Sequence, residues 1–368
     1  MKKIAFLMLS LMALFSCQKK AESSAMVYNI DGAESVEAEL SSVKYVPLET
    51  SEEALVGNIK KMLYQNHLFY LFDDALESIL IFREDGSLVQ SVNRKGSGPG
   101  EYVMAMDIDV DAEGNLYVSD AGRQCIMAYS GEGYQAYKEI QVDYPFVEFI
   151  VENEHSVYLA GVAREEKINV NLAHLDVQSG ALELLEESQY ENEYSTLRFA
   201  PQSLFRTDYG LFYFSHLKHQ ILSLHDGEAA EYVTFASERW PSAEVMESWQ
   251  SKNSIEILRD RTYIHDLSAY FETDTKIFAQ LTAMPPILVL ADKQTGMCSI
   301  LGKMADDSFP ITPRVNACSD GSFVTWCAPT KQIIDKILQS EALDDGTKRK
   351  LLALDEEANP IVIVYKMK

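Results

Sequence analysis

The sequence predicts an all-β protein, a six-bladed β-propeller with helical insertions on one face and a last blade closed by both termini. Short alternating runs separated by turn residues recur along the chain, which is typical of small antiparallel strands. Strand-like segments also lie at both ends, at residues 36–49 and 360–367. The recurring units have second strands that begin near Phe69, Leu116, Val157, Leu211, Ile277 and Phe323. Because a four-stranded blade takes about 40 to 50 residues, six starts indicate six blades.

Residues 1–16 have the pattern of a signal peptide. Lys2 and Lys3 precede an apolar run, residues 4–15, that is too short to span a bilayer as a helix. The run ends in Leu-Phe-Ser-Cys, which resembles a bacterial lipobox. The resemblance implies acylation of Cys17 and attachment to the cell envelope, with the outer membrane as the expected site, facing the periplasm or the surface. A plain secretory signal with an incidental cysteine is the alternative.

Residues 17–35 read as the lipidated cysteine followed by a polar tether, and residues 36–368 as a single propeller domain. The first and last strand-like segments pair in one shared blade, since closure removes exposed sheet edges. Two insertions, near residues 238–262 and 329–357, have helical periodicity. Thr330 is a candidate N-cap of the second. We expect the insertions to flank or cover the central channel, or else to pack over strand ends.

The composition excludes one class of partner. The chain has 32 Lys and Arg against 56 Asp and Glu, a net charge of −24. Such a chain repels nucleic acid and anionic lipid surfaces, so no DNA or RNA binding is expected.

The stretch "NRKGSGPGEY", residues 93–102, raises the question of a phosphate cradle. A Walker-type loop needs a lysine after the last glycine, whereas Lys95 precedes Gly96 and a strand follows. Pro99 also removes an amide donor. The stretch is better interpreted as the link from blade one to blade two.

Several segments of the chain resemble a known family. "DAEGNLYVSDAGRQCIMAY" looks like an NHL repeat. "GSGPGEY", the lipobox and the "NPIVIVYK" ending together resemble the Bacteroidetes-type six-bladed β-propeller lipoproteins. The resemblance implies a propeller fold and an envelope location, and it implies no agreed activity.

Strand alternation divides the connections between two faces. Turns between first and second strands, and between third and fourth, lie on one face, called the bottom. The other connections lie on the top, which is less acidic and which we expect to admit neutral or acidic partners. The candidate ligand-binding residues, all expected near the top or the channel mouth, are Arg94, Lys95, Arg123, Arg164, His216, Lys218, His219 and Trp326.

Metal, calcium and disulfide sites are disfavoured. His216 and His219 lack a third ligand other than His265. The run from Asp109 to Asp120 matches a calcium loop only in part and reads as a turn between strands. A turn at residues 319–322 places Cys318 opposite Phe323 rather than Cys327, so free thiols are favoured. We expect no cofactor and no metal.

The expected function is binding. No complete catalytic set is recognisable beside the predicted rigid ring. We expect a monomeric, envelope-anchored, non-enzymatic binding or scaffold propeller that recognises a peptide, a glycan fragment or a protein partner through its top face. The alternative is a lyase or hydrolase with its active site at the mouth of the central channel.

Overall fold

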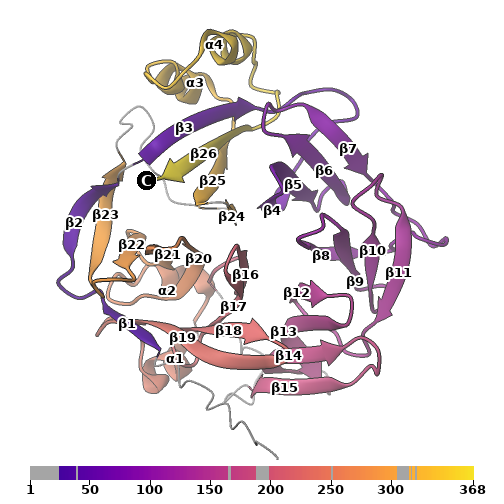
Figure 1. Ribbon diagram of the computed structural model, residues 1–368, viewed down its shortest axis with the longest axis vertical. Helices are drawn as coiled ribbons and strands as arrows, with labels where there is room; N and C mark the ends of the chain where they lie inside the picture. The colour runs from indigo at the N-terminus through magenta and orange to yellow at the C-terminus, as the bar shows by residue number, and fades with distance from the viewer. Residues whose placement is uncertain are drawn as a thin grey trace, which may run out of the picture.

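The computed structural model confirms the six-bladed β-propeller. It describes residues 25–368 except residue 39 and residues 165–166, 188–198, 250–251, 305–314, 316 and 320. Six sheets of four or five strands are arranged in a ring (Figure 1). In each sheet the strands follow outward from the channel in chain order, except that three sheets add a strand of the N-terminal segment at their outer edge.

The blades are numbered along the chain. Blade 1 contains β4 (Ile59–Gln65), β5 (Leu68–Asp73), β6 (Ser78–Arg83) and β7 (Leu88–Val92). Blade 2 contains β8 (Ala105–Val110), β9 (Leu116–Asp120), β10 (Cys125–Tyr129) and β11 (Ala136–Gln141). Blade 3 contains β12 (Glu148–Asn153), β13 (Ser156–Arg164), β14 (Lys167–Asp176) and β15 (Leu182–Glu187).

The other three blades each take one strand from the N-terminal segment. Blade 4 contains β16 (Leu204–Thr207), β17 (Gly210–Ser215), β18 (Gln220–His225), β19 (Glu228–Ala236) and β1 (Met26–Asn29). Blade 5 contains β20 (Asp266–Glu272), β21 (Lys276–Thr282), β22 (Ile287–Asp292), β23 (Cys298–Met304) and β2 (Glu34–Ala38). Blade 6 contains β24 (Ala317–Ser319), β25 (Ser322–Cys327), β26 (Ile361–Met367) and β3 (Leu40–Pro47).

The core lies between the blades. The described apolar residues form six buried clusters, one at each seam between neighbouring sheets. The central strands are therefore covered on both faces, which explains why β5, β6, β9 and β10 are apolar or aromatic with almost no exposed position.

The shared closing blade is confirmed. β3 pairs antiparallel with β26, with Val46 opposite Val362 and Lys44 opposite Val364. The residues that pair, 40–47 and 361–367, lie within the predicted segments 36–49 and 360–367, whereas residues 36–38 pair in blade 5 instead. In the same blade Cys318 lies opposite Phe323, as the predicted turn requires.

The predicted polar tether is too long, because strand pairing begins at Met26 rather than after residue 35. β1 runs parallel to β19, and β2 runs parallel to β23 (Figure 1). Tyr28 and Ile30 are buried against the seam of blades 4 and 5. The segment of residues 26–47, which we call the belt, thus covers the outer edges of two blades before it completes the third.

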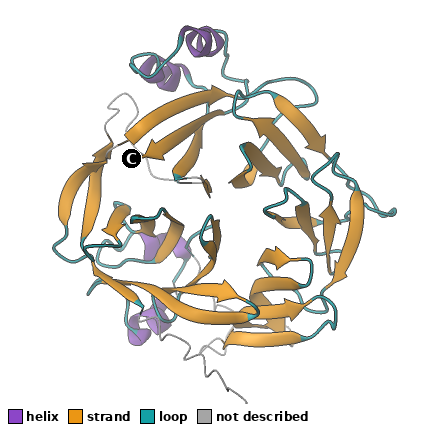
Figure 2. Cartoon of the chain, in the orientation of Figure 1, coloured by secondary structure: helices purple, strands orange, loops and turns teal. Residues whose placement is uncertain are grey.

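The helices lie in the two predicted insertions (Figure 2). α1 (Ala243–Trp249) and α2 (Ser254–Leu258) connect blades 4 and 5, whereas α3 (Lys331–Ile337) and α4 (Asp345–Leu352) connect β25 to β26. Thr330 caps α3 as predicted, since its side chain accepts the Ile333 N–H. Of the helices in the described residues, none has the length and apolar character to cross a membrane.

The second insertion does not cover the channel. α3 and α4 lie outside the ring beside β3 (Figure 1). Ile334, Ile337 and Leu351 pack there in the cluster that contains Tyr45 of β3. The apolar stripe of α3 is thus used to cover the rim of blade 6, which corrects the expectation of a lid and supports the alternative of packing over strands.

Candidate functional site

The Gly-Pro-Gly-Glu-Tyr stretch forms a loop closed by its own side chains. The Glu101 carboxylate accepts the Gly98 N–H at 2.7 Å, and a Cβ on Gly96 would collide with the same carboxylate. Tyr102 is fully buried, and its hydroxyl donates to the Glu77 carbonyl at 2.7 Å. A carboxylate of the chain therefore occupies the place that a bound phosphate would need, and the loop serves as a link between blades.

The predicted cations of this link are used within the fold. The Arg94 guanidinium donates to the Tyr134 carbonyl at 3.0 Å and lies over the ring of Tyr129. Lys95 forms an ion pair with Glu77. Arg94 thus ties blade 1 to blade 2, whereas Lys95 pairs within blade 1 and its side chain stays 60% exposed.

Arg123 is engaged in the same way. Its guanidinium donates to the Glu101 carbonyl at 2.8 Å and to the Glu139 carboxylate at 2.6 Å. These cations of blades 1 and 2 thus have partners within the fold, and the expectation of a top face open to acidic partners stays a prediction.

The remaining candidates are dispersed. Lys218 is exposed in a top turn of blade 4, whereas Trp326 is half-buried against the cluster between blades 6 and 1. Arg164 ends β13, but its side chain lies outside the described residues, as does Cys17.

The three histidines considered for a metal do gather at the seam of blades 4 and 5. His216 Nδ1 lies 3.3 Å from Asp266 Oδ1. His219 stacks on Trp240, with ring centroids 4.6 Å apart. Burial, together with the nearby His216, lowers the pKa of His219 to about 4. His265 packs between the rings of Phe199 and Trp249.

This histidine group is an aromatic packing arrangement rather than a ligand set. Within the described ranges, the metal-like grouping of side chains is a different one, Glu152, His225 and Asp226 on the bottom face. The residues of the partial calcium loop also diverge. Asp109 pairs with Arg206, whereas the Asp120 carboxylate accepts the N–H groups of Val103 and Met104.

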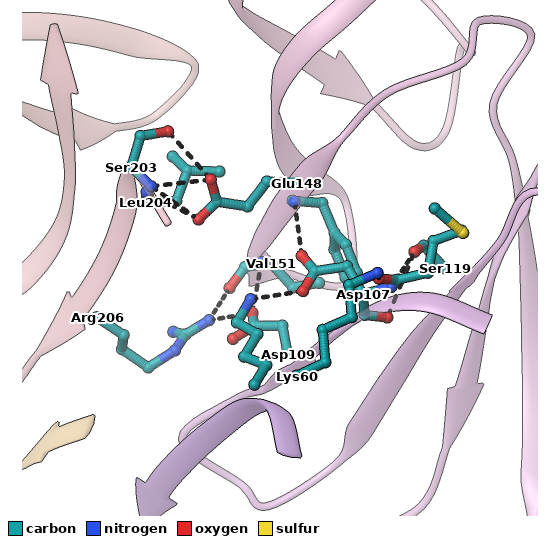
Figure 3. Close-up of polar contacts among 12 residues, drawn as sticks. Lys60, Asp107, Asp109, Ser119, Glu148, Val151, Ser203, Leu204 and Arg206 are labelled. Atoms are coloured by element: carbon teal, nitrogen blue, oxygen red, sulfur yellow. Dashed lines mark hydrogen bonds and ion pairs between the residues drawn. The ribbon is translucent and has the colours of Figure 1, made fainter. Parts of the chain in front are cut away.

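A polar network that we did not predict joins the inner strands around the channel (Figure 3). The Glu148 carboxylate of β12 accepts the backbone N–H groups of Ser203 and Leu204, at 2.9 Å each, and the Ser203 hydroxyl at 3.0 Å. These donors belong to blade 4. A carboxylate of one blade therefore saturates the open edge of the next inner strand.

The same device joins blade 2 to blade 3. Asp107 accepts the Phe149 N–H at 3.2 Å, and Asp109 accepts the Val151 N–H at 2.8 Å. Arg206 of blade 4 then donates to the Asp109 carboxylate at 2.7 Å.

Lys61 of blade 1 completes the network through an ion pair with Asp107 at 2.9 Å. Burial alone would lower the pKa of Lys61, but the carboxylates of Asp107, Glu148 and Asp109 outweigh it, and the pKa lies above its ordinary value. Lys61 therefore stays charged near neutral pH, and together with Arg206 it offsets part of the negative charge of the three carboxylates.

The central cavity is lined by inner strands of all six blades and encloses, with its open mouth, about 550 Å³. Its polar lining includes Lys61, Gln65, Asp109, Gln202 and Arg206. The charged groups of this lining, Lys61, Asp109 and Arg206, already hold neighbouring strands together.

The top face over blades 1 to 3 carries the other unpredicted feature, a group of exposed apolar side chains. Fourteen large hydrophobic side chains are exposed among the described residues, and five aliphatic or methionine side chains of this set lie in top connections of these three blades. A sixth, Met106, lies near the start of β8, and Tyr144 lies in the same link as Val147. Their exposed fractions range from 38% for Met106 to 50% for Leu55. We call this group the apolar arc; it consists of Leu55, Leu76, Val103, Met104, Met106 and Val147.

Contacts within and between blades connect the backbone segments that carry the arc. Leu76 lies against Gly57 of the link that contains Leu55. Lys60 of blade 1 donates to the Met106 carbonyl at 2.7 Å. The Asp107–Phe149 bond then joins the entries of blades 2 and 3, next to Met106 and Val147.

The fold is similar to that of a solved structure from Bacteroides. A Bacteroides fragilis protein inferred to be exported superposes with a TM-score of 0.71 at 17% identity, covering 94% of this chain and 100% of that one. A DUF4221 family member from Bacteroides vulgatus gives 0.49 at 11% identity, covering 91% and 99%. A gluconolactonase from Xanthomonas campestris gives 0.47 at 11% identity, covering 90% and 92%.

Among the curated proteins, none matches the sequence. A family model does match, over residues 28–366, which is nearly the whole described propeller. The chain therefore belongs to the family described as a domain of unknown function, DUF4934.

Proposed function

We propose that this protein is a cell-envelope binding propeller that holds a partner polypeptide on its top face. The observation that carries the proposal is the apolar arc. Soluble monomers rarely expose a large contiguous apolar patch, and such patches mark interaction sites. Two of the six side chains are methionines, Met104 and Met106, whose flexible thioethers adapt to irregular apolar surfaces.

The fold supports a scaffold of this kind. Six packed seams and the network of carboxylates around the channel hold the top links in place, so a partner meets a preformed surface. A polypeptide fits the arc better than a glycan fragment does, because the six side chains are aliphatic or methionine and offer few hydrogen bonds.

The envelope location rests on the N-terminal sequence. Acylation of Cys17 would anchor the propeller to the outer membrane, facing the periplasm or the surface. Cys17→Ala is expected to release the protein from the membrane fraction into the soluble envelope fraction. If the Cys17→Ala variant stays in the membrane fraction, the proposed lipid anchor at Cys17 is refuted.

The binding function is tested by selection from a random peptide display library. The bait is the chain of residues 17–368 carrying Cys17→Ser, which prevents acylation. Selected peptides should lose binding to a Met104→Asp, Val147→Asp variant. They should keep binding to Met297→Asp, which changes an apolar side chain that is 69% exposed on the bottom face. Equal binding to all three proteins would refute a site on the arc.

The alternative function is a lyase or hydrolase at the channel mouth. The contact that favours it is His216 beside Asp266, a histidine oriented by a carboxylate. Asp266 is fully buried and already accepts the N–H groups of Phe199, Ala200 and Leu267, which is also how a structural carboxylate behaves. Turnover of any substrate that His216→Ala or Arg123→Ala abolishes would establish the enzyme and displace the binding function.

A further inference from the structure

The apolar arc has an acidic rim. Four exposed carboxylates lie in the top connections that carry the arc or border it, and within the described ranges none of them has an ion-pair partner. These residues are Glu52, Glu53, Asp74 and Asp143. Among the described residues, the side-chain donor to the Asp74 carboxylate is a neutral amide, that of Asn58, at 2.6 Å.

The cations that could neutralise this rim are used elsewhere. Lys95 pairs with Glu77, and Arg123 pairs with Glu139. Lys60 donates to the backbone carbonyl of Met106, so one described cation does lie beside the arc. The charge at the edge of the apolar surface is therefore negative on balance, although this is the face with the greater share of cations in the sequence.

We infer that the partner segment is cationic, with apolar side chains that cover the arc and lysine or arginine side chains that meet the carboxylates around it. This inference rests on the proposed function and adds the chemistry of the partner. Apolar anchors at the centre and charged pairs at the rim are the usual division of an interface. At physiological salt, charges interact over about 8 Å, so the partner's cations must flank its apolar residues closely.

Charge at the rim also acts on the rate of encounter. Complementary charges raise the association rate and suppress partners of the wrong sign, whereas the central apolar contacts set the dissociation rate. Acidic and neutral segments of the same apolar content should therefore bind more weakly than a basic one, and the difference should shrink at high salt.

Three synthetic peptides of equal length test this inference. They share their apolar residues and carry lysine, glutamate or serine at the remaining positions. Fluorescence anisotropy with the chain of residues 17–368 carrying Cys17→Ser should give the tightest binding for the lysine peptide. Met104→Asp with Val147→Asp should weaken that binding by about tenfold or more.

A basic peptide could bind any acidic protein non-specifically. Two pairs of charge-reversal substitutions, one at the rim and one on the bottom face, distinguish this attraction from binding at the arc. Glu53→Lys with Asp143→Lys at the rim should weaken the lysine peptide and strengthen the glutamate peptide. Glu113→Lys with Glu132→Lys on the bottom face changes the net charge equally and should alter neither. Equal effects of the two pairs would show non-specific attraction and overturn the inference.

The outcomes separate the two proposals. If the glutamate or serine peptide binds tightest and the arc variant abolishes that binding, the partner is not cationic but the binding face stands. If peptides selected from the display library bind the arc variant as well as the parent protein, the binding face itself is refuted.

Discussion

Glu148 and Ser203 join blade 3 to blade 4 through a carboxylate that accepts both the backbone N–H and the hydroxyl of the serine, at 2.9 and 3.0 Å. Both residues are buried, with exposed fractions of 3% and 1%. The inner strand of a blade has no neighbour on its channel side, so its N–H groups need acceptors from elsewhere. The Glu148 carboxylate supplies the acceptors that a neighbouring strand supplies in the interior of a sheet.

Glu148→Ala is therefore expected to destabilise the protein by about 3 kcal/mol, because it leaves the Ser203 and Leu204 donors buried without an acceptor. Urea denaturation measures the loss. Glu183→Ala removes an exposed acid from outer strand β15 of the same blade and should change the free energy of unfolding by less than about 0.5 kcal/mol. Similar losses in both variants would mean that Glu148 has no special role at the seam.

Much of the architecture was predictable from the sequence because blade periodicity is a local signal. Turn residues at regular spacing identify strands, and the strand-like segments at both ends indicated the closure between β3 and β26. The belt strands β1 and β2 were not predictable in this way. They are four and five residues long, and their pairing in parallel with β19 and β23 depends on contacts far along the chain.

The candidate site was much less predictable. Asp107, Asp109 and Glu148 look like ordinary strand acids in a chain with 56 acidic residues, and only the ring brings them to the edge of the next blade. Counting cations likewise could not show that Lys95 and Arg123 are paired within the fold. A usable signal was the run of Val103, Met104 and Met106, apolar residues at the end of a link and the start of β8 that are exposed rather than packed.

The belt gives a second prediction. Tyr28 of β1 is 2% exposed and packs against Phe235, whereas its neighbour Val27 is 61% exposed. Tyr28→Ala should lower the free energy of unfolding by about 3 kcal/mol, since it empties part of the seam between blades 4 and 5. Val27→Ala, on the opposite face of the same strand, should be nearly neutral. A silent Tyr28→Ala variant in denaturant unfolding would show that β1 adds little to the ring.

Closure by both termini gives a third prediction. Deleting residues 360–368 removes β26 from the middle of blade 6 and leaves β25 and β3 without their shared partner. The loss should exceed about 4 kcal/mol, beyond a typical point mutation. Deleting residues 18–24, which ends before the first described strand, should leave the melting temperature unchanged. A C-terminal deletion that melts like the parent protein would refute the closure.

Lowering the pH should reduce the stability of the folded protein, because His219 at the seam of blades 4 and 5 is held neutral there. The pKa of this histidine is about 4 in the folded protein, lowered by burial and by His216, against about 6.5 when unfolded. The unfolded state therefore binds more protons between these values, so stability falls as the pH drops from 6.5 to 4. Linkage gives a loss of roughly 2 kcal/mol between pH 7 and pH 5.

His219→Phe keeps a ring to stack on Trp240 and removes the titration, so it should abolish this part of the pH dependence. His155→Phe is the control, because the His155 side chain is 62% exposed on the bottom face. Urea denaturation of the three proteins at pH 7 and pH 5 measures the effect. If the free energy of unfolding of His219→Phe decreases from pH 7 to pH 5 as much as that of the parent protein, another group is responsible for the pH dependence.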